Sequence, residues 1–234
     1  MHRIYQAQID FAVMKRHVDV ALKGLELELR DLESVMENEL YELKEHQQDA
    51  YFSNVNDYWI ETAEVLPLLQ WHSHLLISYG YFEKVLNDLC ADMKKTNEFS
   101  LSLKDLHGQG ISRARNYLTK VANVEAPFLS KDWASISCLG DLRNVIAHRG
   151  GFVDYEPNLP SSLSCRLSNI EGIELRQETM NQHDAQVVFG HGLIIMALET
   201  FSRFCGELGV ACQAANNSFK PTPHRGSGHV PTLR

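Results

Sequence analysis

Residues 18–43 read VDVALKGLELELRDLESVMENELYEL. A period of three, four and seven residues places apolar side chains along one face of an α-helix. The apolar residues with these spacings are Val18, Leu22, Leu25, Leu29, Leu32, Val35, Met36, Leu40 and Leu43. We therefore predict a long amphipathic helix over about residues 10–48, with an acidic, solvated opposite face.

The overall composition is that of a folded domain. The chain has 234 residues, of which 44% are hydrophobic, so it can bury one sizeable core. Its 22 basic and 30 acidic residues give a net charge of −8, which argues against a protein that coats nucleic acid with a broad basic surface. Only residues 101–150 are positive, with 7 basic and 4 acidic groups, and we expect an anionic ligand to bind there.

Helical periods and turn residues in the remaining sequence predict the rest of the architecture. The expected fold class is all-α, an up-and-down helical bundle with a small β-hairpin inserted before the last helix. We expect one domain over residues 1–210 and a disordered C-terminal tail over 211–234. The further helices are predicted at about 61–95, 112–121, 131–148 and 184–208, with a polar stretch at 49–57 and hairpin strands at 165–168 and 173–176.

Other sequence features predict the compartment. The five cysteines are odd in number and form no CxxC pair, which favours reduced thiols in a cytoplasmic protein. The N-terminus has no apolar stretch typical of a secretory signal. The most apolar window, residues 187–198, is too short to span a bilayer, so no membrane partner is expected.

The densest polar cluster is residues 141–151, DLRNVIAHRGG. Ser130 is a plausible N-cap for the helix that contains it, and Gly150 stands where a helix commonly ends. Asn144 and His148 are four residues apart and share one helical face. Arg143 lies about 140° from His148 on an ideal helix, so its long stem must reach around or the last turn must unwind.

These residue types suit the cleavage of a phosphodiester. Histidine can take and give a proton near neutral pH, and arginine is a permanently charged donor that matches phosphate oxygens. RNA supplies its own nucleophile, the 2′-hydroxyl. A base that removes the hydroxyl proton and a cation that stabilises the charged phosphorane can therefore cleave RNA without a metal.

The sequence Arg143-Asn144-Val145-Ile146-Ala147-His148 resembles the R-x4-H motif of the HEPN superfamily, with a polar residue directly after the arginine. HEPN domains are helical bundles, and many are metal-independent endoribonucleases in toxin–antitoxin, phage-defence and RNA-processing systems. They typically dimerise, so that two motifs meet across a cleft. The resemblance covers roughly residues 10–208, and its specific element is this motif late in the bundle.

The resemblance implies roles for individual residues. Arg143 would hold the scissile phosphate, His148 would be the general base or acid, and Asn144 would orient the phosphate or the imidazole. We add Arg149, Arg113 and Arg115 as substrate-binding residues because of their charge. No metal or cofactor is expected. The implied partners are RNA, a second copy of the chain, and an inhibitory antitoxin or other regulatory protein.

Several alternatives stay open. His148 and Arg149 would also complement the dipole of a helix end, with Arg143 paired to an acidic neighbour such as Asp141. A HEPN-like module that only binds or dimerises fits that interpretation. Glu83 either faces the site or forms a surface ion pair. Two other assignments stay open. The aromatics belong to the core, to a dimer interface or to base stacking at Trp59, Trp71, Tyr79 and Phe82, and Gly108–Gly110 is a loop or a phosphate-binding turn.

Overall fold

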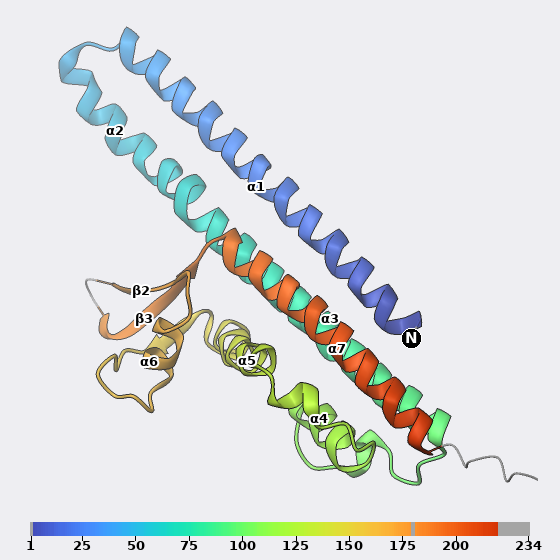
Figure 1. Cartoon of the computed structure of the whole chain (residues 1–234). Helices are drawn as coiled ribbons and strands as arrows, with labels where there is room; N and C mark the ends of the chain where they lie inside the picture. Colours follow the sequence, from blue (N-terminus) through green and yellow to red (C-terminus); the bar gives the residue numbers. More distant parts are fainter. Residues whose placement is uncertain (1, 179–180, 220–234) are drawn as a thin grey trace, which may run out of the picture.

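The computed structural model describes residues 2–178 and 181–219 of the chain. They form a mostly helical protein with one small three-stranded sheet, as Figure 1 shows. The predicted class is therefore confirmed at the level of a helical fold. The α-helices are α1 (His2–Glu42), α2 (Glu45–Ile60), α3 (Leu66–Asn97), α4 (Gly110–Lys120), α5 (Lys131–Arg149), α6 (Leu163–Ser168) and α7 (His191–Phe219). The strands are β1 (Phe152–Asp154), β2 (Ile173–Glu178) and β3 (Asn181–Phe189).

The first two long helical segments form an antiparallel hairpin that extends beyond the rest of the molecule (Figure 1). The predicted break between two helices at 49–57 is wrong, because these residues belong to α2. This helix leads through one π-helical turn, Glu61–Val65, into α3. In this wider turn the Leu66 amide donates to the Glu61 carbonyl, five residues earlier. Pro67 comes next, in the first turn of α3, where a residue without an N–H is tolerated.

The predicted β-hairpin is also wrong in its first strand. Residues 165–168 belong to α6, whereas β3 lies in the centre of the sheet between β1 and β2 and pairs antiparallel with both. The predicted last helix began too early, at 184. Ala185, Val187 and Phe189 are all buried, and this alternation of every second residue is the period of a strand.

The last helix, α7, continues to Phe219, so the predicted domain boundary after residue 210 falls inside it. The remainder of the predicted tail, 220–234, lies outside the described residues. In Figure 1, α7 lies beside α3 and along α1, and these three helices form the long axis of the body.

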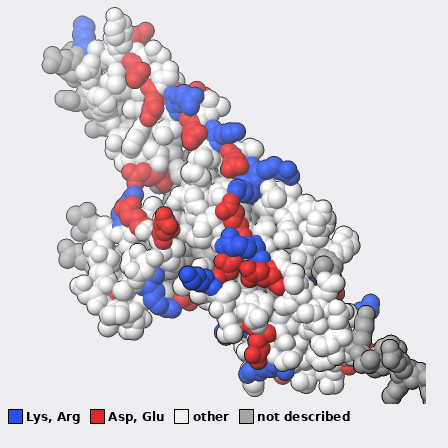
Figure 2. Space-filling model, in the orientation of Figure 1, with Lys and Arg blue, Asp and Glu red and all other residues white. Residues whose placement is uncertain are grey.

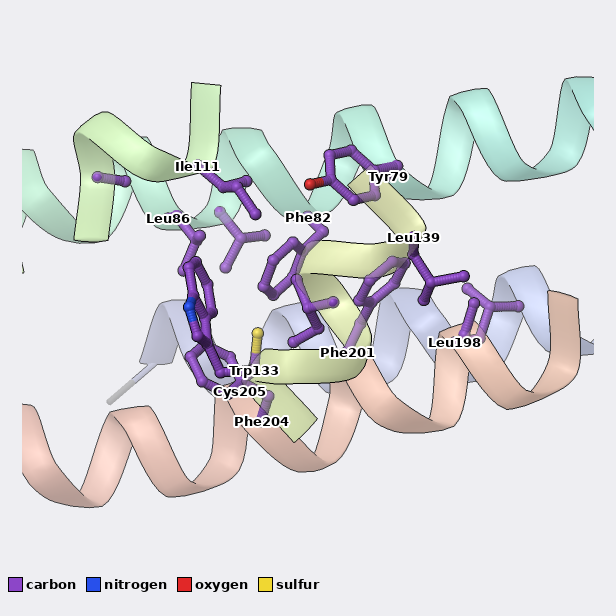
Figure 3. Packing of buried hydrophobic residues seen from close by; sticks show 14 of the residues in the cluster. Tyr79, Phe82, Leu86, Ile111, Trp133, Leu139, Leu198, Phe201, Phe204 and Cys205 are labelled. Carbon is purple, nitrogen blue, oxygen red and sulfur yellow. The ribbon is translucent and has the colours of Figure 1, made fainter. Parts of the chain in front are cut away.

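An aromatic core joins α3, α5 and α7 (Figure 3). The rings of Phe82 and Phe201 are stacked with centroids 4.6 Å apart, and Phe204 contacts Trp133 at 5.4 Å. Tyr79 lies at the margin of this cluster, again buried. The core interpretation of the aromatics is thus confirmed for Trp71, Tyr79 and Phe82. Within the described part of the chain, no helix has the length and apolar character needed to cross a membrane.

Candidate functional site

The helix that carries the sequence motif begins and ends as predicted. The hydroxyl of Ser130 accepts a hydrogen bond from the Trp133 amide at 3.2 Å, which caps the N-terminus of α5. At the other end, Gly150 adopts a left-handed conformation with φ 62°, and the Gly151 amide bonds the Val145 carbonyl at 3.2 Å. Because α5 stays helical through Arg149, its last turn does not unwind.

Arg143, Asn144 and His148 line one open pocket of about 590 Å³. The Arg143 guanidinium extends toward Asn144, whose side chain lies on the same face of α5 as His148. Three segments form the walls: α3, α5 and the first turn of α4 with the residue before it. The remaining lining residues are Tyr79, Glu83, Gln109, Gly110, Ile111, Ser112, Ser137, Gly140 and Asp141.

The guanidinium of Arg143 is held by its neighbour rather than by a carboxylate. Its Nη1 donates to Oδ1 of Asn144 at 3.1 Å, and its buried Nε has no hydrogen-bond partner among the described residues. Asp141, the predicted alternative partner, accepts instead from Arg166 of α6 at 2.7 Å. Within the described ranges Arg143 forms no ion pair within 4 Å.

Glu83 faces the pocket from α3, as one of the two open interpretations predicted. Both its carboxylate oxygens lie 3.6 Å from the point where a Cβ on Gly110 would stand, beside the N-terminus of α4. The positive end of a helix dipole stabilises a carboxylate there. With Glu83 and Asp141 in its wall beside Arg143, the pocket has mixed charge.

Tyr79, which we expected in the core, at a dimer interface or in base stacking, also lines the pocket. Burial raises the pKa of its hydroxyl, the Glu83 carboxylate adds to the increase, and Arg143 opposes it. A tyrosine hydroxyl is a hydrogen-bond donor when protonated, and this one belongs to the wall of the pocket. Its four-residue spacing from Glu83, which puts both on one face of α3, was the available signal.

The three other predicted arginines do not line this pocket. Arg149 forms a bidentate pair with Asp154 at 2.8 and 2.9 Å and lies 3.7 Å from Asp184. Arg113 donates to the Gly108 carbonyl at 2.7 Å. The guanidinium of Arg115 lies over the Trp133 ring at 5.8 Å, a cation–π distance.

The histidines away from the motif make structural contacts. His72 is buried, and its Nε2 bonds the Val187 carbonyl at 3.0 Å. His74 lies 3.0 Å from His17 of α1, nitrogen to nitrogen. His183 lies in β3. Among residues 2–178 and 181–219, no cluster of three His, Cys, Asp or Glu residues is arranged to hold a metal ion.

Comparisons with protein-family models, with curated proteins and with solved structures found no match to this chain.

Proposed function

We propose that the protein is an endoribonuclease that cleaves RNA by attack of the 2′-hydroxyl, with Arg143 and His148 as catalytic residues. One observation carries the proposal: an arginine without an ion pair among the described residues and an exposed histidine, five positions apart on α5, line the same pocket. The pocket is open to solvent, so a flexible strand can enter it. Its residues supply a cation for a phosphate and an imidazole that can accept a proton.

In the proposed reaction, His148 takes the proton of the 2′-hydroxyl, and the 2′-oxygen forms a bond to the adjacent phosphorus. The bond from phosphorus to the 5′-oxygen breaks, and that oxygen takes up a proton from water. The products are a 2′,3′-cyclic phosphate and a 5′-hydroxyl. Arg143 stabilises the negative charge on the phosphorane, and its bond to Asn144 fixes the direction of the guanidinium.

The proposal includes a family, a dimer and a regulatory partner. The motif, its position before the last long helix and the helical frame together resemble a HEPN bundle. A dimer that brings two motifs together, and a restraining antitoxin or regulator in a toxin–antitoxin or phage-defence system, are what that resemblance implies. Arg113, Arg115 and Arg149 have no role in the proposal, because each contacts other parts of the protein.

The test compares purified wild type with Arg143→Ala and His148→Ala on RNA in the presence of EDTA. Arg149→Ala is the matched control, since it removes an arginine at the same helix end that does not line the pocket. We expect losses of about 10²-fold or more in the two site variants and near wild-type cleavage in the control. An RNA with a single 2′-deoxy nucleotide at the cut position should resist cleavage.

Two results would count against the proposal. Equal cleavage by wild type and both site variants would remove the roles of Arg143 and His148. If instead wild type binds RNA and leaves it intact under all conditions, with binding lost only in Arg143→Ala, the protein is the non-catalytic binding module that the sequence left open.

A further inference from the structure

The outer part of the helical hairpin differs from the rest of the chain in its charge. Residues 22–65, the outer part of the helical hairpin, contain 12 acidic and 3 basic residues, a net charge of −9. The rest of the chain holds 18 acidic and 19 basic residues, a net charge of +1. Residues 22–65 therefore account for the whole net negative charge of the protein.

The hairpin is also poorly covered by the rest of the chain. In α1, none of the residues after Val18 is buried. Two hollows lie between α1 and the helix formed by α2 and α3, with volumes of about 680 and 520 Å³. Glu28 lines both, so the two hollows are neighbours along α1, and we call them together the hairpin groove.

The floor and rims of the hairpin groove are mostly apolar and exposed. Leu69 and Ile77 on the α3 side are 58% and 66% exposed, and Leu27 and Val35 on the α1 side are 55% and 52% exposed. Apolar side chains in a row on a groove of this kind mark a protein interaction site. The groove follows α1 from Val13 to Val35, which is about 33 Å at the rise of an α-helix.

The hydrogen bond between His17 and His74 fixes the separation of the two walls. His74 donates from Nδ1 to the Gln70 carbonyl at 2.8 Å, so its Nε2 accepts from Nδ1 of His17. The two walls are thereby joined at the inner end of the groove. A ligand helix would find a preformed surface there, which lowers the cost of binding.

The negative charge of the hairpin groove favours a positively charged ligand. Glu28 and Asp31 line it, and neither forms an ion pair among the described residues. Figure 2 shows carboxylates and basic groups interspersed on one face of the molecule, including the hairpin. A second copy would bring another −9 against the first, which is unfavourable. A basic helix would gain both apolar contact and charge complementarity.

We propose that the hairpin groove is the docking site of a basic amphipathic helix from another protein. The mode is a helix in a groove, with leucine-like anchors three and four residues apart and lysine or arginine on the flanks. About 20 residues of helix match the length of the groove. This inference does not depend on the proposed nuclease activity, since it uses other residues.

The probe is a fluorescent synthetic helix of about 20 leucine and lysine residues in an amphipathic pattern, with a leucine–glutamate helix as its counterpart. We expect the basic peptide to bind wild type at least about tenfold more tightly than the acidic one. Leu69→Gln/Ile77→Gln and Glu28→Gln/Asp31→Gln should each weaken binding about tenfold. The matched controls outside the groove, Leu129→Gln/Leu159→Gln and Glu156→Gln/Glu171→Gln, should bind like wild type.

Circular dichroism shows whether each variant keeps its helical fold, and sedimentation equilibrium gives its oligomeric state. Three outcomes overturn the proposal: no binding of the basic peptide, equal weakening by the groove and control variants, or a wild-type dimer that Leu69→Gln/Ile77→Gln dissociates. The last result would assign the groove to a second copy of this chain. None of these outcomes bears on RNA cleavage, so the two proposals fail separately.

Discussion

The hydroxyl of Tyr79 on α3 lies against the Cα of Gly140 on α5, so close that a Cβ at position 140 would overlap with it. Both residues line the pocket of Arg143 and His148. Gly140 is buried within a helix, where glycine costs up to about 1 kcal/mol relative to alanine, so its presence has a packing reason. The missing side chain makes room for a protonated phenol in the wall of the pocket.

We therefore expect Gly140→Ala to lower the free energy of unfolding by about 1–3 kcal/mol, despite the better helix propensity of alanine. Removing the phenol oxygen with Tyr79→Phe should relieve most of this cost. Urea denaturation of wild type, both single variants and the double variant measures the coupling. Strictly additive effects would show that the overlap is not what makes alanine unfavourable.

Gly151, just after α5, has a backbone conformation and a close neighbour that a larger residue would not tolerate. Its φ is 90°, and a Cβ there would come within 2.7 Å of Cε1 of His72. Gly151→Ala should cost about 2–4 kcal/mol of stability from backbone strain and the clash together. Gly150→Ala is the matched control: φ is 62° and nothing lies within 4 Å of its Cβ position, so only about 1–2 kcal/mol is expected. Thermal unfolding ranks the two, and equal costs would contradict the predicted clash.

The buried imidazole of His72 gives the protein a predictable response to acid. Burial lowers the pKa of His72 below its ordinary value, although its bond to the Val187 carbonyl opposes the shift. As pH falls below about 6.5, the unfolded chain takes up a proton at this residue that the native state does not. The free energy of unfolding should then fall with decreasing pH, by at most about 1.4 kcal/mol per unit for this one proton.

His72→Gln removes this titration, and its unfolding free energy between pH 7 and pH 5 should depend less on pH than that of wild type. Urea midpoints measured at several pH values give the two slopes. An identical slope in both proteins would show that other groups control the response to acid.

Arg166 is expected to act on the pocket indirectly. It holds the carboxylate of Asp141 at 2.7 Å, and Asp141 lines the pocket together with Arg143. In Arg166→Ala the free carboxylate would compete for the guanidinium of Arg143, lowering RNA cleavage about fivefold. Stability should change by less than about 1 kcal/mol, because the pair is solvent-exposed.

The second substitution Asp141→Asn removes the competing charge, and the double variant should recover cleavage close to the wild-type rate. A loss of cleavage that persists in the double variant would mean that Arg166 acts in another way. The measurement is the initial rate on one RNA at saturating and at low concentration, which separates turnover from binding.

Local features of the fold were predictable because they depend on residues close together in the chain. The helical period of residues 18–43, the cap at Ser130 and the stop at Gly150 all act through bonds within a few positions. The relation of Asn144 to His148 on one face of α5 follows in the same way. The prediction for 49–57 was wrong because these residues are mostly polar and show no helical period of apolar residues, although they belong to a helix that continues into α3.

Long-range contacts decided what the sequence left open. Residues 184–189 became a strand because β1 and β2 supply partners for both of its edges, which a local pattern does not show. The bond of Arg166 to Asp141 and the pair of Arg149 with Asp154 determined which arginine stays available for a ligand. Tyr79 entered the pocket because Gly140, on another helix, leaves space for it. The order of residues thus determined which chemical groups α5 carries, whereas packing between distant segments decided which of them converge.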